Sequence, residues 1–89
     1  MDPKFPAGVL VKFVSLGVHA GTVHGISTQV RGMGTFVDSY YIRLFCDSTS
    51  VSTNVHSLLN IDDPEEPLTC ERCEWGLLEH RVRKQHAKV

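Results

Sequence analysis

The sequence predicts a mainly β fold, a small barrel of four to five antiparallel strands followed by a short C-terminal helix. Short runs of β-branched and aromatic residues fill residues 1–61, and glycines separate these runs. Apolar residues at helical spacing occur only near the end of the chain. A chain of 89 residues has room for one hydrophobic core. Short strands in such a domain avoid exposed edges by curling into a barrel.

The first strand is expected in the run VLVKFVS, residues 9–15, between Gly8 and Gly17. Its apolar side chains fall on both faces, which suits a strand inside a closed sheet.

A long hairpin is expected next, with arms at residues 22–31 and 35–45 joined by Gly32-Met33-Gly34. Glycines at both shoulders supply the positive φ angles that a tight connection requires. The alternation in the first arm slips around Gly25, which indicates a β-bulge. The second arm has two faces, with Tyr40, Ile42, Leu44 and Cys46 on one and Tyr41, Arg43 and Phe45 on the other.

The last part of the β region is expected to hold a weaker strand in TSVSTNVHS, residues 49–57, and a helical turn in LLNI, residues 58–61. The organisation predicted is then a barrel at residues 1–61, an acidic linker at 62–69 and a basic helical tail headed by C-x-x-C at 70–89.

The tail is expected to be helical from Glu74 onward, because Trp75, Leu78 and Val82 follow helical spacing. Gly76 weakens the first turn of that helix, since glycine is a poor helix former.

Four segments together resemble an SH3-like barrel of the KOW or Tudor type: PAGVLVKF, HAGTVHGI, YYIRLFC and VSTNVHSLLNI. The resemblance covers residues 6–61 and is carried by Gly8, Gly21-Thr22-Val23 and Tyr40–Leu44. It implies a closed barrel with a short helical turn. Such barrels bind RNA, DNA, methylated peptides or other subunits, so the resemblance implies no single function. The stretch STQVRGMGTFVDS is longer than a KOW unit needs.

A second resemblance leads to another fold. GISTQVRGMGTFVDSYYIRLF is similar to the central strand pair of discoidin-type domains. Those domains are much longer, and the Asp-Gly-Trp stretch that they carry next is absent here.

The tail carries a candidate zinc site made of Cys70, Cys73, His80 and His86, spaced C-x2-C-x6-H-x5-H. Zinc takes four thiolate or imidazole ligands at the corners of a tetrahedron, and a C-x-x-C turn presents two thiolates at a suitable separation. The two histidines lie about 240° apart around an ideal helix, so both can ligate only where the helix frays.

Other interpretations of the cysteine pair remain open. The fourth ligand can come from Cys46, His56 or another chain, or the thiols can simply pack under Trp75. A redox pair is the third alternative, although such pairs usually lie at a helix start in a βαβ context.

We expect a non-catalytic binding module that mediates protein–protein interaction or assembly, in a larger complex or as a homo-oligomer. No nucleophile elbow, phosphate-binding glycine loop or paired carboxylate motif suggests an enzyme. One alternative is nucleic-acid binding, in which basic side chains contact phosphates; another is a zinc-binding regulatory protein. The residues expected to contact a protein partner are Tyr41, Phe45, Trp75, Leu78 and Val82, and those expected to contact phosphates are Arg81, Arg83 and Lys84.

Composition predicts an intracellular, cytoplasmic protein without a membrane role. The net charge is −1, and neither a leader nor a run of about 18 apolar residues is visible. Three cysteines, an odd number, do not make a disulfide framework.

Overall fold

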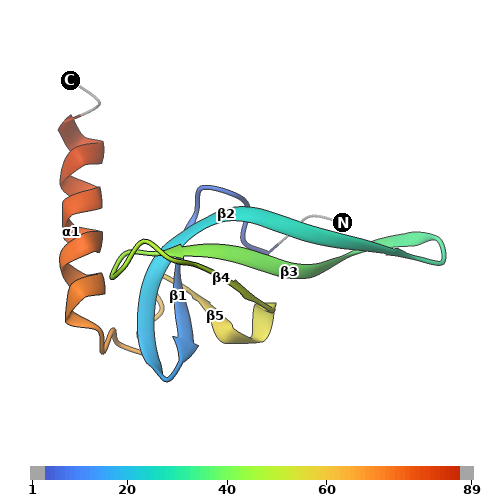
Figure 1. The fold of residues 1–89 in the computed structure, drawn as a ribbon, viewed down its shortest axis with the longest axis horizontal. Helices are drawn as coiled ribbons and strands as arrows, with labels where there is room; N and C mark the ends of the chain where they lie inside the picture. Colours follow the sequence, from blue (N-terminus) through green and yellow to red (C-terminus); the bar gives the residue numbers. More distant parts are fainter. Residues whose placement is uncertain (1–3, 87–89) are drawn as a thin grey trace.

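The computed structural model describes residues 4–86, apart from the side chain of His86. It contains one antiparallel sheet of five strands and one α-helix, with a short 3-10 helix before the last strand (Figure 1). The elements are β1 (Leu10–Ser15), β2 (Gly17–Arg31), β3 (Gly34–Leu44), β4 (Ser50–Thr53), the 3-10 helix (Val55–Ser57), β5 (Leu58–Asn60) and α1 (Glu71–His86).

The strands lie in the order β4-β3-β2-β1-β5, and every neighbouring pair is antiparallel. The mainly β class with a C-terminal helix is therefore confirmed. Among the described residues no ladder joins β4 to β5, so the hydrogen-bonded sheet is open and the predicted closed barrel is not seen in it.

The predicted hairpin forms, but β2 begins at Gly17, five residues earlier than expected. Its first half pairs with β1 and its second half with β3, which makes it the strand that links the two parts of the sheet. The register shifts between Val23 and Gly25, which confirms the predicted bulge, and shifts again between Ser27 and Thr28. The far end of the hairpin projects away from α1 (Figure 1).

The helical turn predicted at residues 58–61 is wrong, because residues 58–60 form strand β5 and pair with β1. The turn lies just before them, at Val55–Ser57. The side chain of Asn54 caps it by accepting a hydrogen bond from the backbone N–H of His56 at 3.0 Å. The α-helix also starts earlier than expected, at Glu71, and so includes the second cysteine of the pair.

The hydrophobic core lies within the sheet. Tyr40, Ile42 and Leu44, which share one predicted face of β3, are all buried. The core cluster is completed by residues from the N-terminal segment, β1, β2 and β5. Its members are Phe5, Val11, Val23, Tyr40, Ile42, Leu44 and Leu58.

One buried cation fastens the acidic linker to the sheet. Lys12 on β1 is only 6% exposed, and its ammonium group donates to the backbone carbonyls of Asp63 and Glu66. Two carbonyl oxygens thus satisfy the charge, which is what a lysine at this depth requires. The linker consequently runs along the sheet on its way to α1.

Candidate metal centre

Three cysteines and one histidine meet where α1 packs on the sheet. His19 lies on β2, Cys46 in the turn after β3, Cys70 just before α1 and Cys73 in its first turn. Their possible ligand atoms all lie within 4.8 Å of one another. The His19 Nδ1 atom is 4.0 Å from the Cys46 Sγ and 3.8 Å from the Cys73 Sγ. These four residues are called the metal cluster below.

These separations are close to those of a zinc site. With Zn–S bonds of about 2.3 Å and Zn–N bonds of about 2.0 Å, a tetrahedron places its ligand atoms about 3.5–3.8 Å apart. The metal cluster therefore needs only a small contraction to surround an ion. His19, Cys46, Cys70 and Cys73 could hold a metal such as zinc.

Backbone pairing with β2 places Cys70 beside His19. The N–H of Val18 donates to the Thr69 hydroxyl at 2.8 Å, and the Val18 carbonyl accepts from the N–H groups of Thr69 and Cys70 at 3.1 and 3.3 Å. Since His19 is the next residue on β2, this pairing fixes the entry to α1 against the histidine.

A tight turn presents Cys46. The Asp47 carboxylate accepts from both the N–H and the hydroxyl of Thr49, at 3.0 and 2.6 Å. Ser48 adopts a positive φ of 60°, and the N–H of Phe45 donates to the Ala20 carbonyl at 3.0 Å. The turn is thus tied to β2 one residue beyond His19.

Gly76 allows α1 to approach this turn. A Cβ at this position would lie 2.5 Å from the Cβ of Phe45, far inside any normal contact. The glycine that lowers the helix propensity of α1 therefore lets the helix pack closely against Phe45, the residue before Cys46. Cys73, one turn earlier, is fully buried and directs its thiol at the Ala20 carbonyl, 3.5 Å away.

The surroundings shift the pKa values of the thiols in opposite directions. Burial raises the pKa of Cys46 to about 12, with further contributions from Cys73 and Asp47. Burial also raises the pKa of Cys73. The backbone N–H of Cys73 lowers the pKa of Cys70, because it donates to that sulfur at the start of α1. A bound cation would favour the deprotonated form of all three thiols.

The donor set fits a structural zinc ion. Three thiolates and one imidazole are a known structural zinc ligand set, and four protein ligands leave no position for water or substrate. The arrangement can join three chain segments through one ion.

The structure brings together part of the ligand set expected from the sequence. Cys70 and Cys73 belong to the metal cluster, and so does Cys46, one of the alternatives for the fourth ligand. His80 is outside the cluster; its ring packs against Phe45 with centroids 5.5 Å apart. The side chain of His86 lies outside the described part of the chain.

His19 has no counterpart in the sequence prediction. It lies 27 residues before Cys46 and within a strand, so no motif spacing links it to the cysteines. His19 becomes a neighbour of Cys70 through the pairing of the linker with β2, which the sequence does not reveal.

The residues expected to contact a protein fall into two groups. Trp75, Leu78 and Val82 lie exposed on the outer side of α1, at 66, 54 and 42%. Tyr41 is partly exposed on β3, whereas Phe45 is half-buried beneath α1.

The residues expected to contact phosphates lie on the exposed end of α1. Arg83 forms an ion pair with Glu79 at 2.6 Å, and Arg81 lies 3.9 Å from the carboxylate of Asp62. Lys84 is exposed. Two of the three cations thus have an acidic neighbour.

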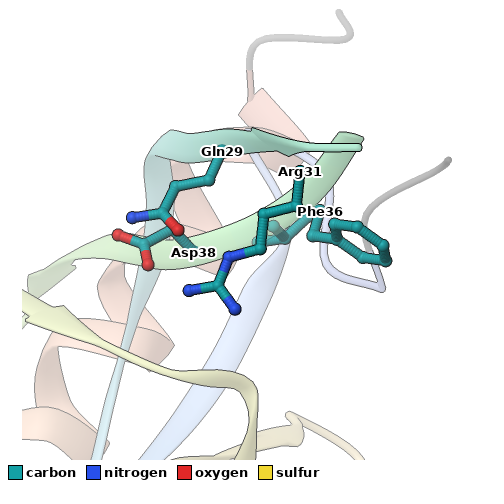
Figure 2. A pocket seen from close by; sticks show the side chains of 5 residues that line it. Gln29, Arg31, Phe36 and Asp38 are labelled. Carbon is teal, nitrogen blue, oxygen red and sulfur yellow. The ribbon is translucent and has the colours of Figure 1, made fainter. Parts of the chain in front are cut away.

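A separate hollow lies at the far end of the hairpin, away from the metal cluster. Gln29, Arg31, Phe36, Val37 and Asp38 line it, and Figure 2 shows the polar side chains grouped on one side of the strands. The labelled side chains are exposed.

The chain matches no protein-family model, no curated protein and no solved structure. Within residues 4–86 no helix is both long and apolar enough to span a bilayer.

Proposed function

We propose that the chain is a zinc-stapled, non-catalytic interaction module in which the metal cluster joins α1 to the sheet. The observation that carries the proposal is the convergence of four ligand atoms, from β2, the turn after β3 and the start of α1, within 4.8 Å. A core of this size leaves only about 3–5 kcal/mol of stability. A structural zinc ion contributes apparent binding free energies of about 10–16 kcal/mol.

We also propose that the sheet is of the SH3-like type. Support comes from the five-stranded antiparallel sheet and from the 3-10 helix directly before β5. This agrees with the helical turn near the end of the barrel that the resemblance implies. The two edge strands, β4 and β5, follow one another in the chain with that 3-10 helix between them.

Metal analysis of the purified protein tests the proposal. We expect about one zinc per chain, lost in His19→Ala and in Cys46→Ser because each removes a ligand. His56→Ala is the matched control. His56 is exposed on the 3-10 helix and lies outside the metal cluster, so this variant should keep its zinc. A metal-free wild type whose melting temperature ignores chelator contradicts the proposal.

The partner that the outer face of α1 fits best is a second copy of this chain. The first half of α1 carries Glu71 and Glu74, and the second half carries Arg81, Arg83 and Lys84; Arg72 and Glu79 are the exceptions. An antiparallel second helix would bring each acidic half against a basic half and cover the exposed apolar side chains. Nucleic-acid binding has less support, because Arg81 and Arg83 already have acidic neighbours.

Light scattering on zinc-loaded protein tests the self-association. We expect a dimer for the wild type and a monomer for the double variant Trp75→Ala, Leu78→Ala, which removes most of the apolar contact. Leu16→Ala is the control, because Leu16 is 98% exposed in the turn between β1 and β2. A monomeric wild type contradicts the self-association and leaves the zinc proposal standing.

A further inference from the structure

We infer that metal occupancy controls whether α1 is docked. With the ion bound the helix packs on β2, and without it the helix detaches while the five-stranded sheet stays folded. This rests on the proposed zinc binding and adds to it a regulatory consequence: metal availability sets whether the outer face of α1 is presented in a fixed position.

The sheet has a core that does not depend on the helix. The core cluster is drawn from residues 5–58 and includes no residue of α1. The helix in turn buries only Cys73 and Leu77 among its described side chains. Since Cys73 belongs to the metal cluster, Leu77 is the one buried side chain among the described side chains of α1 that packs independently of an ion.

The helix is weak on its own. Isolated helices shorter than about 12–15 residues are marginal in water even when they are rich in alanine. With 16 residues α1 is barely longer, and Gly76 lowers its helix propensity. The five side chains from Arg81 to Gln85 are all exposed, so the last turns receive no support from the sheet. Figure 1 shows this end of α1 standing clear of the strands.

The linker is attached to the sheet independently of α1, and the last of these attachments marks where the helix would detach. Lys12 holds the carbonyls of Asp63 and Glu66, and Thr69 pairs with Val18. These contacts involve no metal ligand. Detachment should therefore begin at about Cys70, where the chain leaves β2.

Packing against Phe45 opposes detachment, because Gly76 and His80 both contact its side chain. Phe45 is next to Cys46, however, and Cys46 faces Cys70 and Cys73 at the start of α1 through ligand atoms that lie within 4.8 Å of one another. Loss of the ion would thus remove the bond between this turn and the start of α1. What remains is the buried Leu77, the half-covered ring of Phe45 and the exposed pair of Arg81 and Asp62, whose charged atoms lie 3.9 Å apart.

The experiment compares full-length, isotope-labelled protein with zinc and after chelation with EDTA, by amide NMR. We expect resonances of residues 71–86 to move to random-coil positions while those of β1–β5 keep their dispersion. Trypsin cleavage after Arg72 should accelerate about tenfold or more, because proteolysis follows the population of the opened segment.

Variants separate the possible outcomes. His19→Ala in the presence of zinc should reproduce the chelated spectrum, and His56→Ala should reproduce the zinc-bound one. If zinc binds but chelation disperses the sheet resonances along with the helix, or leaves residues 71–86 unchanged, the inference is overturned. If no zinc binds at all, the proposed function itself falls, and metal analysis of the same sample distinguishes that failure.

Discussion

At the residue scale, Gly76 lowers the helix propensity of α1 but allows the helix to pack closely against Phe45. Ala is a better helix former than Gly by about 1 kcal/mol, so Gly76→Ala would stabilise an isolated helix. In the folded protein its Cβ would lie 2.5 Å from that of Phe45. We expect a net destabilisation of about 1–3 kcal/mol, as for other overpacked contacts.

Urea unfolding of zinc-loaded Gly76→Ala measures this directly. Gln85→Ala is the control, since Gln85 is exposed on the same helix and should be neutral or slightly stabilising. A Gly76→Ala protein at least as stable as the wild type would show that α1 does not approach the turn this closely.

The thiols predict a pH dependence of metal uptake. Burial raises the pKa of Cys46 to about 12 and also raises that of Cys73, so both are protonated in the metal-free protein near neutral pH. Binding must displace these protons, and apparent zinc affinity therefore rises with pH and falls on acidification. Two displaced protons correspond to about a 100-fold change in affinity per pH unit. Calorimetry in buffers of different ionisation enthalpy counts the protons, and binding without proton release would contradict the assignment.

The cysteine pair could be recognised from the sequence, but the other two ligands could not be fixed. C-x-x-C is a local pattern whose spacing suits metal binding, so Cys70 and Cys73 can be recognised from the sequence. Cys46 was one of several candidates for the fourth position. His19 depends on which strand the linker pairs with, and that is information about tertiary structure alone.

At the element scale, a buried cation holds the linker to the sheet through backbone carbonyls. Lys12→Met keeps the length of the side chain but removes both donors to the carbonyls of Asp63 and Glu66. Hydrogen bonds from a charged donor contribute about 1.5–3 kcal/mol each, and the apolar replacement recovers part of that. We expect a loss of about 1–3 kcal/mol in unfolding free energy.

Urea denaturation tests the Lys12 substitution, with Arg43→Met as the matched loss of a cation at an exposed site on β3. Hydrogen exchange of residues 62–69 should accelerate in Lys12→Met alone. Equal effects of the two substitutions would mean that Lys12 has no special role in holding the linker.

Strands with clear alternation were predictable, and the short closing elements were not. β1 and β3 follow their patterns of apolar residues, and the bulge at Gly25 marks a real shift of register. The stretch LLNI carries no period long enough to separate a turn from a strand. Residues 58–60 form a strand because they pair with β1, and Asn54 caps the helical turn just before them.

At the scale of the whole molecule, the domain divides into a self-contained sheet and a helix held chiefly at one end. The core supports the sheet and Lys12 supports the linker, and we propose that an ion bound by the metal cluster supports α1. The predicted closure of the sheet into a barrel is not seen, because no hydrogen-bonded ladder joins β4 to β5 among the described residues. Composition could indicate the class, because glycines and β-branched runs dominate residues 1–61, but edge pairing depends on how strongly the strands bend.

X-ray absorption at the zinc edge of the loaded protein tests the central claim most directly, because it counts ligands by element. We predict three sulfur neighbours at about 2.3 Å and one nitrogen at about 2.0 Å, from Cys46, Cys70, Cys73 and His19. Two sulfurs and two nitrogens would instead fit Cys70 and Cys73 with His80 and His86. That result would contradict the metal cluster as the joint between sheet and helix.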